Sequence, residues 1–256
     1  MCDLKPDLQS DPDQDHAAGR PPRLDIGHHG FAQDTLPALD HGPVDLRAFF
    51  GFGDGSEGGN GGGCPGVAGD ARTPAGPGVA RPLELEIGSG KGTFLVQQAR
   101  LQPGTDFLGI EYAGAFWRHA ADRCRRHGLE NVRLLHADAT VFVRNYVAES
   151  CLHRVHLYFP DPWPKKRHHK RRSFQEPFLR ELHRVLEPGG ELHVATDHAD
   201  YFTWMEEHAA RVVDLFERRP FVPPPSAGAG ELVGTNFERK YRVEGRTFNA
   251  MVLASR

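Results

Sequence analysis

The stretch from Leu83 to Leu95, LELEIGSGKGTFL, is the first whose residue types and spacing indicate chemistry. Because it contains Lys91, the glycine turn of this stretch is similar to the phosphate-binding loop of a nucleotide kinase. With Glu86 directly before it, the turn is equally similar to one that holds S-adenosylmethionine. The kinase loop has the form G-x-x-x-x-G-K-[ST], but here its first glycine position is Leu85 and Gly92 follows the lysine. The dinucleotide pattern G-x-G-x-x-G also fails, by one residue.

Acidic side chains mark the ends of three predicted strands. Glu86 precedes the glycine turn, Glu111 ends FLGIE, and Asp138 follows the strand that runs into HADA. Ligands of open α/β sheets lie outside the carboxyl ends of the strands, where Glu111 can accept ribose hydroxyl protons and Asp138 can meet an adenine amino group. Such acids repel a triphosphate and suit a ligand that carries a sulfonium and an ammonium. The alternative is that each acid caps the following helix. Together with the glycine turn, they favour a methyl-donor site.

A rigid loop and a basic run follow the fourth predicted strand, in YFPDPWPKKRHHKRRSF. Two prolines fix the backbone of Asp161-Pro162-Trp163-Pro164, so the loop is preorganised. For Trp163 we expect core packing rather than base stacking. The dense Lys and Arg cluster indicates contact with RNA phosphates, and the alternative for such a run is a solvated face.

Alternating strands and helices must position these residues. Strand patterns cover residues 83–88, 106–111, 132–137, 154–159 and 191–196, and helix patterns cover 93–100, 114–127, 141–147, 174–186 and 201–216. Two β-rich runs around Glu244-Gly245 predict a hairpin. The fold class that we predict is α/β, with a mainly parallel seven-stranded Rossmann-like sheet, helices on both faces and a C-terminal β-hairpin.

The first 80 residues differ in composition from the rest. We predict a low-complexity, largely flexible extension over residues 1–80 and a single domain over 81–256. Within the extension, the Gly- and Pro-rich stretch from Gly51 to Gly78 is expected to be a linker. The apolar residues of Leu36 to Phe52 suit docking onto the domain.

Composition and termini bound the remaining possibilities. No window has the roughly 18 apolar residues of a membrane span, and the acidic start does not read as a secretory signal, so we expect a cytoplasmic protein. Cys2, Cys64, Cys124 and Cys151 show no C-x-x-C spacing, which predicts reduced thiols and no metal site. The net charge of -3 argues against general coating of nucleic acid but allows a local basic patch.

From about Pro82 to its end, the chain resembles the bacterial tRNA guanine-N7 methyltransferase family. The resemblance rests on EIGSGKG, GIE, the DA at Asp138-Ala139, YFPDPWPKKRHHKRR, the ATD at Ala195 to Asp197, and TNFE. It implies a class I S-adenosylmethionine-dependent methyltransferase that methylates N7 of guanine 46 in the tRNA variable loop. The implied partner is tRNA, with no membrane and no metal, and the chain acts as a monomer or homodimer.

The resemblance also implies roles for individual residues. Asp161 corresponds to the active-site acid. The implied donor-binding residues are Glu86, Gly88, Gly90, Glu111, Asp138 and Asp161. The implied substrate-binding residues are Lys165, Asp197, Thr235, Asn236, Phe237 and Glu238. The segment implied to contact RNA is Arg167, His168, His169, Lys170, Arg171 and Arg172.

Three positions depart from the family pattern: Pro164 replaces a histidine, His198 an aromatic and Asn236 a lysine. Guanine N7 has a lone pair and no proton, so methyl transfer to it needs alignment rather than a general base. We expect Asp161 and Asp197 to stabilise the positive charge that develops on the purine. Two other classes stay open at this point, a nucleotide kinase and a non-catalytic RNA-binding protein that keeps the methyltransferase fold.

Overall fold

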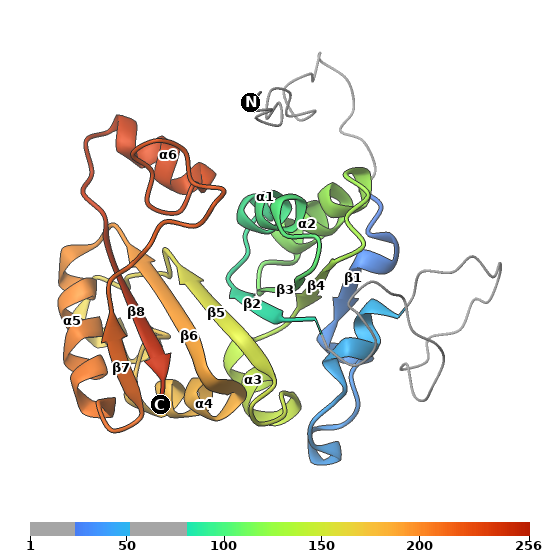
Figure 1. The fold of residues 1–256 in the computed structure, drawn as a ribbon, viewed down its shortest axis with the longest axis horizontal. Coiled ribbons are helices and arrows are strands. Elements are labelled where there is room, and N and C mark those ends of the chain that lie inside the picture. Colours follow the sequence, from blue (N-terminus) through green and yellow to red (C-terminus); the bar gives the residue numbers. More distant parts are fainter. Residues whose placement is uncertain (1–23, 52–80) are drawn as a thin grey trace, which may run out of the picture.

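The computed structural model describes residues 24–51 and 81–256 (Figure 1). The predicted linker, apart from Gly51, lies outside these residues, as does the start of the chain. The division between residues 1–80 and 81–256 therefore stays a prediction.

One eight-stranded sheet forms the centre of the described chain (Figure 1), in the order β1-β4-β3-β2-β5-β6-β8-β7. The pairs from β1 to β6 are parallel, whereas β8 runs antiparallel to both of its neighbours. The predicted α/β class is confirmed, with one strand more than expected. The strands are β1 (Gly30–Ala32), β2 (Leu83–Ile87), β3 (Asp106–Glu111), β4 (Val132–His136), β5 (Leu152–Tyr158), β6 (Leu186–Thr196), β7 (Phe216–Arg219) and β8 (Asn249–Ser255).

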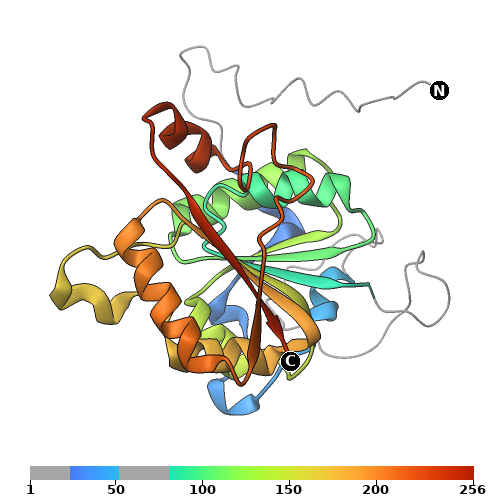
Figure 2. The same cartoon turned by 60° about the vertical axis from the view of Figure 1, so that its left-hand side comes forward.

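Helices cover both faces of the sheet (Figures 1 and 2). Successive side chains of a strand point to opposite faces, so Phe107 of β3 packs in the core under α1 and α2 while Leu108 packs in the core under α3, α4 and α5. The helices are α1 (Thr93–Leu101), α2 (Gly114–Arg126), α3 (Ala139–Tyr146), α4 (Glu176–Val185), α5 (Ala199–Ala209) and α6 (Asn236–Val243). The 3₁₀ helices are η2 (Gly27–His29), η3 (Gln33–Thr35), η4 (Leu39–His41), η5 (Leu46–Phe50), η6 (Lys166–Arg171) and η7 (Ala210–Val212).

The hairpin predicted around Glu244-Gly245 is wrong. The first of the two runs forms α6, Glu244 is the C-cap of this helix, and Gly245 follows with φ +77°. Only the second run is a strand, β8, and it pairs with β6 and β7. The N-cap at Thr235, whose side chain accepts from the Glu238 N–H, explains the difference, because it starts a helix where β-propensity alone predicts a strand.

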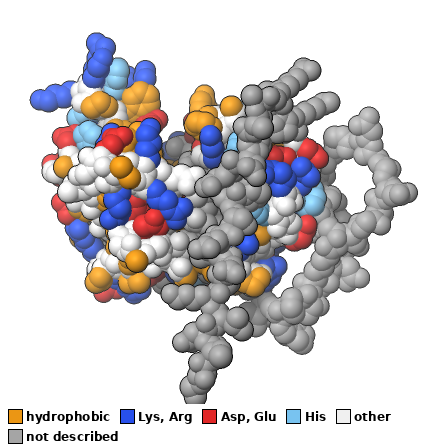
Figure 3. All heavy atoms as spheres, turned by 90° about the horizontal axis from the view of Figure 1, so that it is seen from above, with side chains coloured by type: hydrophobic (Ala, Val, Ile, Leu, Met, Phe, Trp, Pro, Cys, Tyr) orange, Lys and Arg blue, Asp and Glu red, His pale blue; other side chains and the backbone are white. Residues whose placement is uncertain are grey.

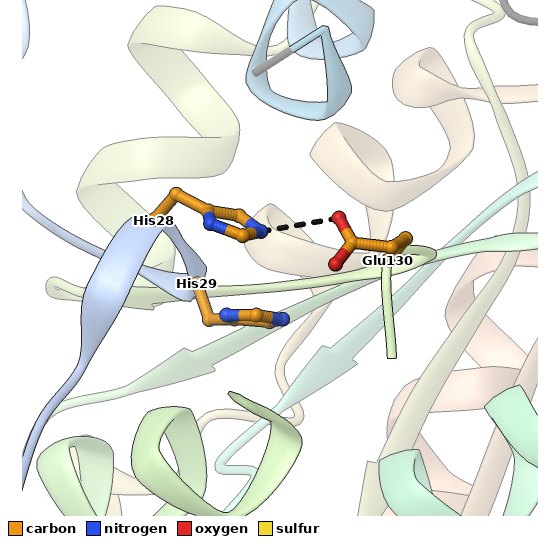
Figure 4. A group of neighbouring side chains, drawn as sticks. All are labelled: His28, His29 and Glu130. Atoms are coloured by element: carbon orange, nitrogen blue, oxygen red, sulfur yellow. Dashed lines mark hydrogen bonds and ion pairs between the residues drawn. The ribbon is translucent and has the colours of Figure 1, made fainter. Parts of the chain in front are cut away.

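Residues 24–51 wrap the outer edge of the sheet beside β4. Leu46 and Phe49 are buried in the core, as the apolar content of this stretch led us to expect. The Arg133 Nε donates to the Phe49 carbonyl at 2.7 Å. On the other side of this edge, His28 Nε2 lies 3.1 Å from the Glu130 carboxylate, with the His29 ring stacked beside it (Figure 4). The segment is thus held by apolar packing and by polar contacts.

Among the helices of the described residues, none combines the length and the apolar character that a bilayer crossing requires.

Candidate functional site

A cavity of about 1020 Å³ opens at the carboxyl ends of the central strands. Parallel strands present their carboxyl ends at one edge of a sheet, so loops that are distant in sequence meet there. The cavity collects nine of the predicted donor- and substrate-binding residues: Glu86, Gly88, Gly90, Glu111, Asp138, Asp161, Thr235, Asn236 and Phe237. Arg171 of the basic run lines it as well.

The glycine turn forms one wall of the cavity. Gly88 and Gly90 have φ values of +77° and +55°, a region that side chains rarely adopt. A Cβ built at either residue would meet no atom of residues 24–51 or 81–256 within 4 Å, so backbone conformation rather than crowding requires glycine here. The N–H groups of Gly88 and Ser89 both donate to the Ile110 carbonyl, which ties the turn to the end of β3.

A glycine inside β3 supports the turn from behind. A Cβ on Gly109 would lie 2.5 Å from Leu95 Cδ1 and 2.7 Å from Leu134 Cδ1. Such contacts are too short for any other residue without displacing the core. Our sequence reading did not assign this glycine a role, because an isolated glycine in a strand pattern does not show what approaches it.

Glu86 is a buried acid that lacks a partner. It is 4% exposed, and its Oε2 makes no hydrogen bond within the described part of the chain. Burial, with a smaller contribution from the Glu111 charge, raises the pKa of Glu86 well above its usual value. A buried, unpaired carboxyl group that faces a cavity fits a cationic ligand group, because such a ligand would supply both the missing hydrogen bond and the counter-charge.

Glu111 holds its carboxylate in place through backbone contacts. Its Oε2 accepts from Gly90 N–H at 2.8 Å and its Oε1 accepts from Ala113 N–H at 2.7 Å. Each carboxylate oxygen can accept a second hydrogen bond, so the group retains capacity for ligand hydroxyls. The side chain is half-buried at the cavity wall.

Asp138 is an N-cap as well as a cavity residue. Its Oδ1 accepts from Thr140 N–H and Val141 N–H at the start of α3. The alternative interpretation of this acid, a helix cap, therefore holds. Asp138 also lines the cavity, so the two interpretations do not exclude each other.

Asp161 lies in a strained loop at the mouth of the cavity. Phe159 and Trp163 on either side of it have φ values of +52° and +44°. Such conformations cost about 1–3 kcal/mol each in non-glycine residues and persist only where the surroundings fix them. Trp163 is half-buried and lines the cavity, so the expected pure core packing is wrong for this side chain.

Arg172 fixes this loop from inside the protein, which corrects its expected RNA contact. It is 2% exposed, and its Nε donates to the Pro162 carbonyl at 2.8 Å. The same guanidinium pairs with Asp200 at 2.6 Å and lies over the rings of Tyr201 and Trp204. A buried side chain with these partners cannot reach a phosphate in this conformation.

The remainder of the basic run is exposed or half-buried. It forms η6, the yellow-gold projection at the left of Figure 2. Arg171, exposed, lies over the Trp163 ring at 4.9 Å and so links η6 to the cavity. Seen from above, Lys and Arg side chains gather at one corner of the surface with His side chains beside them (Figure 3). Lys165, Arg167, His168, His169 and Lys170 do not line the cavity.

Glu238 is buried rather than available to substrate, which corrects its expected role. It is 0% exposed, and its Oε2 accepts from the N–H groups of Val233 and Gly234 at 2.8 and 2.9 Å. Thr235 Oγ1 in turn accepts from Glu238 N–H at 3.1 Å. T-N-F-E thus has the T-x-x-E spacing of a capping box, a signal that the sequence contained, but only the Thr235 half of the box forms, and Glu238 accepts from the residues before Thr235 instead. The box presents Phe237, which stacks on Phe159 at 4.8 Å between centroids.

Asp197, another expected site residue, lies outside the cavity lining. Asp197 pairs with Arg246 at 2.5 Å, and its side chain is 12% exposed. Its carboxylate is therefore already neutralised, which argues against its expected part in charge stabilisation. Lys91, the residue that gave the glycine turn its similarity to a phosphate-binding loop, is exposed and lines the cavity.

The chain is similar in sequence to known methyltransferases. A protein-family model described as "Putative methyltransferase" matches residues 80–249. A tRNA (guanine-N(7)-)-methyltransferase of Halorhodospira halophila is 41% identical over 178 residues, which cover 68% of this chain and 75% of that protein. The protein of the same name from Thermus thermophilus is 43% identical over 65% of this chain and 52% of its own length. A crystal structure of TrmN from Thermus thermophilus aligns with a TM-score of 0.48 at 18% identity, over 69% of this chain and 44% of that one.

Proposed function

The chain belongs to the tRNA (guanine-N7-)-methyltransferase family, and on this basis we propose that it transfers the methyl group of S-adenosylmethionine to N7 of a guanine in tRNA. We further propose that the target is guanine 46 of the variable loop. The observation that carries the proposal is one cavity that joins the unpaired Glu86 carboxyl group, the glycine turn and Asp161.

The residues present fit the methyl donor. S-adenosylmethionine supplies an electrophilic methyl group on a sulfonium. Glu86 would accept a hydrogen bond from the donor ammonium, and Glu111 would accept from the ribose hydroxyls with its remaining lone pairs. A nucleoside triphosphate fits less well, because its phosphates would lie among acids and a buried carboxyl group.

Asp161 is the group that we propose acts during transfer. Its carboxylate is exposed at the cavity mouth, and no side chain of the described residues pairs with it. The guanine N7 lone pair attacks the methyl carbon as the carbon–sulfur bond breaks, so positive charge moves from the sulfonium to the purine. A carboxylate held beside the purine by the strained loop stabilises that charge without having to reorient.

The RNA would lie along η6 and the mouth of the cavity. The exposed cations there, Lys165, Lys166, Arg167, Lys170 and Arg171, suit a phosphate backbone. Arg171 stands nearest to the cavity, over Trp163. This arrangement would guide a base towards Asp161 while the backbone remains outside.

Nucleoside mass spectrometry tests the proposal. The protein is incubated with S-adenosylmethionine and a tRNA transcript, and the digest is examined for 7-methylguanosine. A transcript with adenosine at position 46 is the matched control for position. We expect one 7-methylguanosine per wild-type transcript and none in the control. Absence of product from both, with the protein folded and binding ATP rather than S-adenosylmethionine, would overturn the proposal in favour of a kinase.

A further inference from the structure

The segment of residues 24–51 reaches the edge of the sheet where the cavity opens. Strand β1 runs parallel to β4, with Ala32 paired to His136. The carboxyl end of β1 therefore lies at the same edge as the carboxyl ends of β2, β3 and β4. This segment lies outside residues 80–249, the part that the family model matches.

Gln33 directly follows β1 and binds the loop that bears Asp138. Its Oε1 accepts from the Asp138 N–H at 3.1 Å. The Asp138 carboxylate is separately engaged with the start of α3. Two independent contacts therefore fix this residue, one to its own helix and one to the N-terminal segment.

A second hollow of about 510 Å³ lies where the two parts meet. Gln33 and Asp34 line one side of it, and Tyr112, Ala137 and Asp138 line the other. These last three residues also line the main cavity. The loops after β3 and β4 thus form a wall with the main cavity on one side and the N-terminal segment on the other.

We propose that Gln33 is a positioning residue for the adenosine part of the methyl donor and that it acts through Asp138. The proposal rests on the proposed function, because it assumes that the adenosine lies against the loops after β3 and β4. The Gln33 carboxamide holds the Asp138 backbone from outside the cavity. Without the Gln33 oxygen, the loop after β4 would be less ordered, and binding of the methyl donor would have to order it. Donor affinity should suffer, and the transfer step should not.

Two substitutions of nearly equal side-chain length isolate the acceptor. Gln33→Met removes it, whereas Gln33→Glu keeps an oxygen at the same distance along the side chain. His28→Ala serves as the control, because it removes the His28–Glu130 contact that docks the same segment away from the cavity (Figure 4). Thermal unfolding confirms that each variant is folded.

Calorimetric titration with S-adenosylhomocysteine measures donor-site affinity without any need for methyl transfer. We expect Gln33→Met to raise Kd about tenfold, the effect of one lost hydrogen bond. Gln33→Glu and His28→Ala should remain within about threefold of the wild type. In steady-state assays Gln33→Met should raise KM for S-adenosylmethionine and leave kcat and KM for tRNA unchanged.

The outcomes separate this inference from the function on which it rests. Wild-type affinity in Gln33→Met, or an equal loss in His28→Ala, would overturn the role of Gln33 while the proposed function stands. A wild-type protein that does not bind S-adenosylhomocysteine would overturn both.

Discussion

The Glu111 carboxylate accepts a hydrogen bond from the Gly90 N–H at 2.8 Å, so the acid at the end of β3 holds the glycine turn that follows β2. The contact makes the ends of two neighbouring strands one unit. It also places a negative charge near the buried Glu86, where it adds to the effect of burial in raising the pKa of that side chain. Ionising Glu86 therefore costs free energy in the protein alone, and a cationic ligand group beside the carboxylate would lower that cost.

Donor affinity should depend on pH through Glu86. Because the pKa of Glu86 is raised in the free protein, the carboxyl group must lose a proton before it can pair with the donor ammonium. Affinity for S-adenosylhomocysteine should therefore increase as pH rises through that pKa, which calorimetry over a series of pH values measures. In Glu86→Gln the dependence should disappear. An equal slope in both proteins would show that another group titrates.

The free energy of unfolding should decrease as pH rises, whereas donor affinity increases. A group whose pKa is raised by folding stabilises the folded state while protonated, and that contribution is lost as pH rises through the folded pKa. Glu86→Gln should therefore be more stable than the wild type at pH 8, with a smaller difference near pH 5. Urea unfolding at the two pH values measures this. A Gln variant less stable at pH 8 than the wild type would contradict the unpaired state of Glu86.

Neutralising Arg171 should weaken RNA binding without unfolding the protein. Arg171 is exposed at the cavity mouth, so Arg171→Ala should change the free energy of unfolding by less than about 0.5 kcal/mol. The slope of log K for tRNA against log salt should decrease by about 1, as for one lost phosphate contact. Filter binding over a salt series tests this, and an unchanged slope would exclude the contact.

Replacing the neighbouring residue, in Arg172→Ala, should lower stability and leave RNA binding unchanged, the reverse of the effect expected for Arg171→Ala. The buried Arg172 holds the Pro162 carbonyl and Asp200, and loss of a hydrogen bond to a charged group costs about 2 kcal/mol. Urea unfolding should show that loss, while the salt slope of tRNA binding stays at its wild-type value. A reduced slope with full stability would return Arg172 to the RNA surface.

The Glu238 side chain should keep the loop before α6 ordered. Its carboxylate accepts from successive N–H groups at Val233 and Gly234. Glu238→Ala leaves these buried donors unpaired and should speed amide hydrogen exchange at both residues while the exchange of β2 is unchanged. Thr235→Ser, which keeps the capping hydroxyl, is the matched control. Unaltered protection in Glu238→Ala would exclude the Glu238 carboxylate as the support of this loop.

Much of the sheet edge that bears the cavity was predictable from the sequence, because the ends of strands, a glycine turn and acidic residues all have local sequence signals. Glu86, Glu111, Asp138 and Asp161 do meet in one cavity. Burial was not predictable: Arg171 and Arg172 are adjacent and chemically identical, yet only the second faces Tyr201 and Trp204. That difference depends on the packing of α5 against the loop, which no local pattern encodes.

The N-terminal segment, residues 24–51, shows a second reason why sequence patterns did not predict parts of the structure. Strand β1 has three residues, too few for a periodic pattern, and it exists because β4 offers an open edge. Similarly, T-N-F-E was interpreted through the resemblance although its spacing also matches a capping box. The contact that fixes β1 is made with β4, a distant part of the chain. The contacts that fix T-N-F-E are made with the local backbone.

The single-turnover rate of 7-methylguanosine formation by Asp161→Asn tests the central claim most directly. At saturating S-adenosylmethionine and tRNA, nucleoside mass spectrometry should show a rate at least about 100-fold below that of the wild type, because the charge that stabilises the methylated purine is lost. Affinity for tRNA should stay within a few-fold. Product formation at the wild-type rate would contradict the assignment of this cavity and its acid to methyl transfer.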